Sequence, residues 1–87
     1  MNIDLLIKMA NEISAYFASE PDAEQAAKAV AGHIRRYWEP RMRRQMIAYY
    51  GERQGAGLSD LALRGVGLLA AAEPAHAQSG TPPPRNL

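Results

Sequence analysis

Apolar side chains recur at intervals of three and four residues near the start of the chain, which predicts a helix over residues 3–17 with Asn2 as its cap. On a helical wheel the apolar positions extend from Leu5 and Tyr16 round to Ile7, an arc of about 200°. A single neighbouring helix cannot cover an arc of that width. We therefore expect this helix to contact more than one packing partner.

A second apolar pattern, over residues 23–38, predicts another helix, and its apolar side chains are confined to one side of that helix. Ser19 is the expected cap, and Pro21 suits the first turn because the amide it lacks would be unpaired there anyway. The helix is expected to end near Trp38 or Glu39, since Pro40 cannot continue the hydrogen-bond ladder. Its early alanines allow another backbone to approach closely, so we expect this helix to form the centre of the fold.

A third helix is expected directly after the second. Pro40 suits its first turn, and the helix is predicted to run to Tyr50 and to stop at Gly51. Residues 52–57 contain two further glycines and are predicted to form a loop.

A fourth helix is expected over residues 60–72, with Ser59 as its cap. Its apolar residues nearly encircle it. Gly65 and Gly67 each lower helix stability by about 1 kcal/mol relative to alanine. This helix therefore depends on packing against its neighbours.

Residues 74–87 are rich in alanine, serine, glycine and proline, a composition typical of disorder. The predicted fold class is all-α. We expect a small bundle of about four short helices in a domain of residues 1–73, followed by a disordered Pro-rich C-terminal tail at residues 74–87.

The chain has 87 residues, a formal net charge of +1 at pH 7 and no cysteine. So balanced a charge argues against nucleic-acid binding through broad electrostatics. The lack of cysteine removes disulfides and thiolate metal sites and fits a reducing compartment. We expect a cytoplasmic protein that does not enter a membrane, because we find no secretory signal and no apolar run of membrane-spanning length.

Few side chains suit catalysis or metal binding. His33 lies at the edge of an apolar helix face, and we interpret it as a packing or hydrogen-bonding residue rather than a ligand. Glu20, Asp22 and Glu24 are interpreted as the acidic start of a helix, where the dipole favours negative charge, rather than as a cation site. We therefore predict no catalytic, cofactor-binding or metal-binding residue in this chain.

Residues 37–44 concentrate two aromatic side chains, a proline and three arginines, and such side chains supply much of the binding energy at protein interfaces. The segment is open to three interpretations: a solvated basic rim around a core Trp38, a protein contact, or a nucleic-acid contact. We favour protein contact, because the wide apolar arcs of the first and fourth helices leave uncovered apolar surface. The predicted interface residues are Tyr37, Trp38, Pro40, Arg41, Met42, Arg43, Arg44 and Met46.

Two segments resemble a known family. The opening LIKMANEI at residues 6–13 and the string HIRRYWEPRMR at residues 33–43 resemble the delta subunit of soluble NAD-dependent formate dehydrogenases. The string at residues 33–43 is the more specific of the two, and the resemblance spans about residues 3–70.

The resemblance implies a cofactor-free accessory subunit of a cytoplasmic molybdenum enzyme. In that family's complex the alpha subunit holds a molybdenum bis-pterin guanine dinucleotide (bis-MGD) centre and iron–sulfur clusters, while the beta and gamma subunits carry electrons through FMN and clusters to NAD. The delta subunit would bind the alpha subunit, assist assembly or stability, and perform no chemistry. Tyr37 and Trp38 would anchor the turn around Pro40. Arg41, Arg43 and Arg44 would pair with acidic side chains or backbone carbonyl groups of the alpha subunit, and Arg43 is the favoured residue because it borders the apolar face.

Other functions stay open at this point. A transient maturation chaperone would bind the catalytic subunit, or its molybdenum cofactor, before assembly and then leave. A small nucleic-acid-binding helical protein is less favoured, and a self-contained enzyme is the least favoured. Stoichiometry and homodimerisation through the wide apolar faces are also open.

Overall fold

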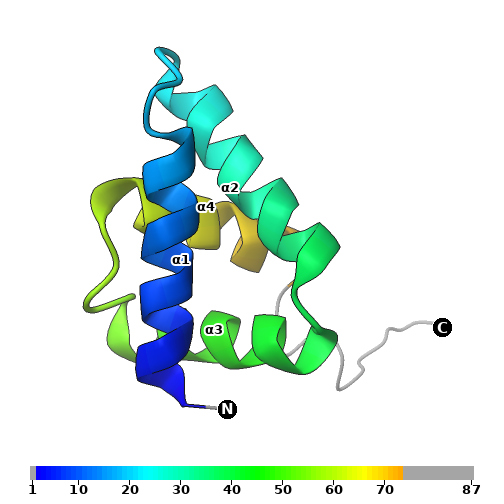
Figure 1. Cartoon of the computed structure of the whole chain (residues 1–87). Coiled ribbons are helices and arrows are strands. Elements are labelled where there is room, and N and C mark those ends of the chain that lie inside the picture. The colour runs from blue at the N-terminus through cyan, green and yellow to red at the C-terminus, as the bar shows by residue number, and fades with distance from the viewer. Residues whose placement is uncertain (1, 74–87) are drawn as a thin grey trace, which may run out of the picture.

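The computed structural model describes residues 2–73, which form the helices α1 (Ile3–Phe17), α2 (Ala23–Tyr37), α3 (Pro40–Arg53) and α4 (Asp60–Ala72) (Figure 1). These residues contain no strand, so the all-α prediction is confirmed. The predicted disordered tail lies outside the described residues. None of the four helices is both long and apolar enough to cross a membrane.

Two helix starts lie where the sequence predicts them. The Asn2 side chain accepts a hydrogen bond from the Asp4 amide at 2.8 Å and caps α1. The Ser59 hydroxyl oxygen accepts one from the Ala62 amide at 3.2 Å and caps α4. In each case the cap satisfies an amide that the first helical turn leaves without a partner.

The predicted start of α2 is wrong. Its cap is Asp22, whose carboxylate accepts hydrogen bonds from the Glu24 amide at 3.0 Å and the Gln25 amide at 3.3 Å. Ser19 lies in the turn that follows α1. A carboxylate can accept from two amides at once and also faces the positive end of the helix dipole, so it is a better cap here than a hydroxyl group.

The predicted end of α3 is also wrong. The helix continues past Tyr50 and Gly51 to Arg53. It ends where Gln54 adopts a φ of 57° and Gly55 a φ of 72°. A helix interior tolerates a glycine at a cost of about 1 kcal/mol, so Gly51 does not stop the helix, whereas the left-handed conformation after Arg53 does.

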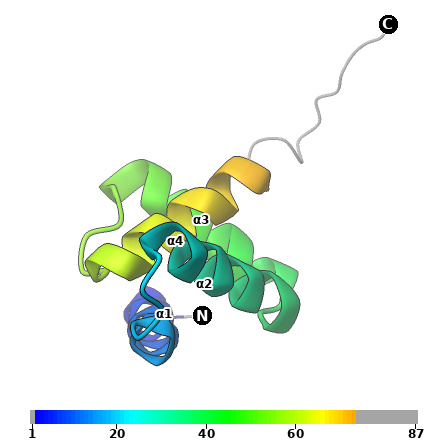
Figure 2. The same ribbon diagram turned by 90° about the horizontal axis from the view of Figure 1, so that it is seen from above.

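Helices α2 and α4 form the most extensive helix pair of the domain, and α1 is the next main neighbour of α2. Seen from above, α1 lies on one side of the other three helices (Figure 2). Helix α3 crosses the base, where it contacts both α1 and α4 (Figure 1). Helix α4 contacts all three other helices, whereas α2 contacts mainly α4 and α1, so the prediction that the second helix forms the centre of the fold names only one of the two central helices. The largest fully buried side chains are Leu6, Val30, Ile34, Met46, Val66 and Leu69.

The contact between α2 and α4 depends on the absence of a side chain at Gly65. A Cβ atom placed at Gly65 would lie 2.5 Å from the Val30 Cγ1 atom and 3.4 Å from the Ala27 carbonyl oxygen. The sequence indicated Gly65 only as a weak point of its helix. The structure shows that the small residue allows the two helices to approach closely.

Residue Asn11 connects α1 to the segment between α3 and α4. Its side-chain amide donates to the Gly57 carbonyl oxygen at 3.0 Å, and its side-chain oxygen accepts from the Ser59 amide at 2.8 Å. The Tyr49 hydroxyl group also donates to the Ala56 carbonyl oxygen at 2.7 Å. These bonds add to the apolar packing of Leu58 against the core and fix the loop to α1 and α3.

The close approach at Gly65 predicts opposite effects for two glycine substitutions. Gly65→Ala should lower the free energy of unfolding by about 1–2 kcal/mol, because the new methyl group overlaps Val30. Gly32→Ala, within α2, should raise it by about 0.5–1 kcal/mol, because no atom lies within 4 Å of a Cβ there and alanine favours the helix. Urea unfolding followed by circular dichroism measures both. Equal changes in the free energy of unfolding for the two variants would contradict the close approach of α2 and α4 at Gly65.

The bonds of Asn11 predict that Asn11→Ala lowers the free energy of unfolding by about 1–2 kcal/mol, because two hydrogen bonds to the backbone are lost. The exposed Lys8, on the same helix, provides the control, and Lys8→Ala should change the free energy by less than about 0.5 kcal/mol. Thermal unfolding of the two variants compares them. A loss as small as that of the control would show that the loop is held by other contacts.

Candidate functional site

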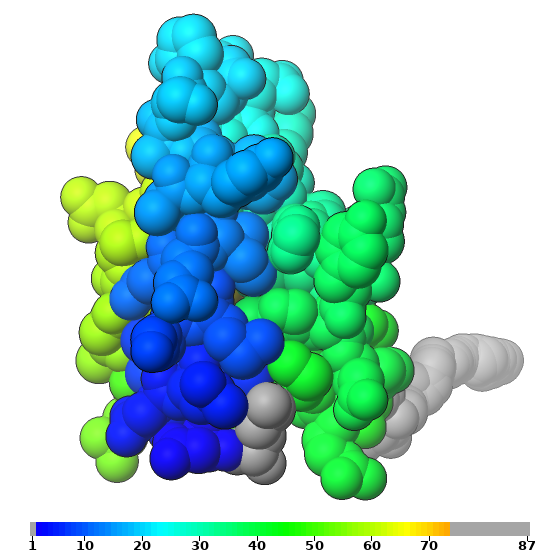
Figure 3. Space-filling view, viewed as in Figure 1, coloured from blue at the N-terminus to red at the C-terminus, as the bar shows by residue number. Residues whose placement is uncertain are grey.

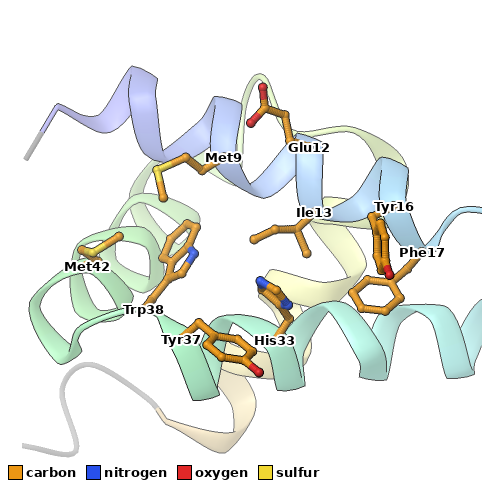
Figure 4. A pocket seen from close by; sticks show the side chains of 9 residues that line it. All are labelled: Met9, Glu12, Ile13, Tyr16, Phe17, His33, Tyr37, Trp38 and Met42. Atoms are coloured by element: carbon orange, nitrogen blue, oxygen red, sulfur yellow. The ribbon is translucent and has the colours of Figure 1, made fainter.

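An open groove of about 750 Å³ lies between α1 and the C-terminal half of α2, and the start of α3 closes one end. The space-filling view shows the hollow between these elements (Figure 3). We call it the α1–α2 groove, and its side chains are drawn in Figure 4. Its lining residues are Met9, Glu12, Ile13, Tyr16, Phe17, His33, Tyr37, Trp38 and Met42.

Helix α1 supplies one wall through positions three, four and seven residues apart. Met9, Ile13 and Phe17 are half-buried and pack against the core. Tyr16 is 79% exposed and meets the Phe17 ring edge-on at a centroid distance of 5.0 Å. The wide apolar arc predicted for the first helix is therefore divided, one part facing the core and the other lining the groove.

Helix α2 supplies the opposite wall. The His33 ring lies 4.7 Å from the Tyr37 ring and 6.2 Å from the Phe17 ring, measured between centroids. In Figure 4 it lies across the groove from Ile13. Tyr37 is 66% exposed. His33 thus packs among aromatic rings, as the sequence predicts.

The predicted interface residues occupy different depths. Trp38 is 5% exposed and belongs to the core while it lines the groove, and Met46 is fully buried in the same core cluster. Met42 is half-buried at the end of the groove near Met9 (Figure 4). Pro40 is exposed at the start of α3. The structure brings Tyr37, Trp38 and Met42 together in one site and places Met46 in the core.

The three arginines of the segment differ in their surroundings. Arg43 is engaged within the chain, where its Nε atom donates to the Glu73 carboxylate at 3.0 Å and its Nη1 atom to the Trp38 carbonyl oxygen at 2.9 Å. Its side chain is 19% exposed. Arg43 therefore ties the end of α2 to the end of α4. Arg41 and Arg44 are exposed.

Two exposed arginines are sequence neighbours of groove-lining residues, although no arginine in the described part of the chain lines the groove itself. Arg36 precedes Tyr37 along the chain, and Arg41 precedes Met42. Within residues 2–73 neither arginine takes part in an ion pair. On the opposite wall Glu12 is likewise exposed and without an ion pair in that part of the chain. Glu12 is therefore the acidic side chain that lines the groove.

The acidic residues near α2 act at its N-terminus. Asp22 is the cap, the Glu20 carboxylate accepts from the Asp22 amide at 3.2 Å, and Glu24 lies 3.8 Å from the ammonium group of Lys28. Across the described residues, no three or more His, Asp or Glu side chains are grouped closely enough to hold a metal ion.

Sequence analysis missed the part of the site that α1 contributes. The signal was present as the wide apolar arc that includes Tyr16, but the sequence could not show which helix would face it. Glu73 as the partner of Arg43 was also missed, because the two residues are 30 positions apart and no local pattern connects them.

The fold and the groove define a small all-α domain with a mostly apolar groove between two of its helices. Residues 5–66 match the model of the family described as NADH-dependent formate dehydrogenase delta subunit FdsD, and the chain belongs to that family. The match includes every groove-lining residue. Comparisons with curated proteins and with solved structures gave no significant match.

The contacts of Arg43 predict a structural role that its neighbour does not share. Arg43→Ala should lower the free energy of unfolding by about 1–3 kcal/mol, because the Glu73 carboxylate and the Trp38 carbonyl group lose a charged donor. Arg44→Ala should change it by less than about 0.5 kcal/mol. Arg43→Lys should restore only part of the loss, because an ammonium group cannot span both acceptors as a guanidinium does. Urea unfolding tests all three, and equal values for the two alanine variants would refute the role.

Proposed function

We propose that this chain is a non-catalytic accessory subunit of a cytoplasmic NAD-dependent formate dehydrogenase, that it binds the large catalytic alpha subunit, and that it supports assembly or stability of the complex. Membership of the delta subunit family supports the assignment to such a complex. The alpha subunit is the partner implied by the resemblance of residues 6–13 and 33–43, with the beta and gamma subunits in the same complex.

The observation that carries the proposal is the exposure of aromatic side chains along the α1–α2 groove. Tyr16 is 79% exposed on one wall and Tyr37 is 66% exposed on the other. Tyrosine combines a large apolar surface with a hydroxyl group that can meet water, and it is enriched at the centres of protein interfaces. A partner that fills the groove would remove both rings from water.

Stabilisation of the partner follows from mass action. A subunit that binds only the folded catalytic subunit lowers the fraction of unfolded partner in proportion to its concentration and affinity. Binding would protect this chain in the same way, because a domain of this size buries a modest fraction of its surface by itself.

The chemistry would belong to the other subunits. His33 is committed to ring packing, and Asp22 caps a helix. We propose that this chain holds no cofactor and that bis-MGD, the iron–sulfur clusters and FMN lie in its partner subunits.

Affinity purification of the full tagged chain from its native cytoplasm, with salt raised during washing and followed by gel filtration, tests this function. We expect the formate dehydrogenase subunits to stay bound in stoichiometric amounts, because apolar contacts are not screened by salt. Recovery of an immature catalytic subunit alone would indicate a transient chaperone. Two outcomes would contradict the proposal. One is recovery of nucleic acid whose binding falls steeply as the salt concentration is raised, and the other is recovery of this chain by itself.

A further inference from the structure

The corner between α2 and α3 joins two helices that pack on other neighbours rather than on each other. Each of them packs mainly on α4 and α1. At the corner Trp38 and Glu39 are both extended, with φ and ψ of −84° and 142° for the first and −65° and 152° for the second. Pro40 has no amide with which to continue the hydrogen-bond ladder of α2. The position of the corner therefore depends on side-chain contacts.

The first half of α3 is weakly anchored by its own residues. Its N-cap, Glu39, makes no side-chain hydrogen bond to the first turn, so the amides there lack the partner that a serine or aspartate cap supplies. The buried side chains of α3, Met46 and Ile47, both lie in its second half. Residues 39–45 are exposed or half-buried. A helix start that lacks both a cap and buried side chains opens at a lower free energy than the core.

Arg43 supplies an anchor for this half of the helix. Its guanidinium donates to the Trp38 carbonyl oxygen at 2.9 Å and to the Glu73 carboxylate at 3.0 Å, and it lies 3.4 Å from the Arg35 carbonyl oxygen. The Arg43 and Glu73 side chains are 19% and 27% exposed, so the pair is partly shielded from water and from salt. One side chain thus holds the start of α3 to the ends of α2 and α4.

The Glu73 carboxylate is only partly satisfied by this contact. Its Oε1 atom accepts from Arg43, whereas its Oε2 atom is buried and accepts no hydrogen bond from the described residues. The Arg35 Nε atom is 3.8 Å from Oε2, too far for a hydrogen bond. A buried oxygen without a donor costs free energy, and opening the contact returns that oxygen to water. The contact holds the corner, but it is easier to release than a fully paired carboxylate.

We propose that residues 38–45 open as a unit while the rest of the domain stays folded, and that the Arg43–Glu73 contact is the latch that keeps this unit closed. Opening carries the Trp38 side chain from 5% exposure into solvent. It also changes the end of the α1–α2 groove that Trp38 and Met42 line (Figure 4). The latch is a conformational control within the chain itself, and it does not depend on the proposed function.

Native-state hydrogen exchange of the full chain tests the opening, with NMR spectra recorded at rising urea concentrations below the unfolding transition. After correction for intrinsic rates, the amides of residues 43–45 should exchange about tenfold or more faster than those of Val30 and Val66, which are fully buried. Their exchange should depend little on urea, because local opening exposes little surface. A common urea dependence for all these amides would overturn the proposal, since the corner would then open only when the whole domain unfolds.

Glu73→Ala tests the latch. Glu52→Ala is the matched control, because Glu52 is exposed on α3 and its loss changes the net charge equally. Glu73→Ala should speed exchange at residues 43–45 about tenfold, because the Arg43 guanidinium loses its charged acceptor. It should also increase the quenching by acrylamide of the fluorescence of Trp38, the one tryptophan in the sequence. The control should change each quantity less than about twofold. Unchanged exchange and quenching in Glu73→Ala would refute the latch.

Discussion

Helices α2 and α4 approach so closely at Val30 and Gly65 that the domain has no room for a single extra carbon atom between them. This contact places Ala27, Val30 and Val66 in the interior and gives α1 and α3 a surface on which to pack. Because α2 directs its apolar face toward α4 and α1, its aromatic C-terminal end is left at the edge of the core. The α1–α2 groove lies at that edge.

Long-range polar contacts hold elements that apolar packing alone would leave loose. Asn11 bonds the loop before α4, and Arg43 joins the ends of α2 and α4 through Trp38 and Glu73. Each uses one side chain to satisfy at least two groups, which restrains orientation as well as distance. The Arg43 bond to the Trp38 carbonyl oxygen also restrains the backbone at a residue that lines the groove. Stability and the shape of the site therefore depend partly on the same residue.

Much of the helical architecture was predictable, because caps and apolar spacing are local signals. Asn2 and Ser59 both cap where the sequence indicated. The errors arose where local signals compete, as between Ser19 and Asp22. The role of Gly65, the pairing of Arg43 and the contribution of α1 to the groove could not be predicted. Each depends on which helix becomes a neighbour in space, and spacing along one helix does not contain that information.

The family assignment and the exposed tyrosines of the α1–α2 groove support our proposal that a partner subunit covers this groove. Amide hydrogen exchange of the full chain, measured free and within the purified formate dehydrogenase complex, tests this claim most directly. The account predicts that exchange slows on assembly mainly in residues 9–17 and 33–42, with little change in α4. Slowing confined to α4, or identical exchange in both states, would contradict it.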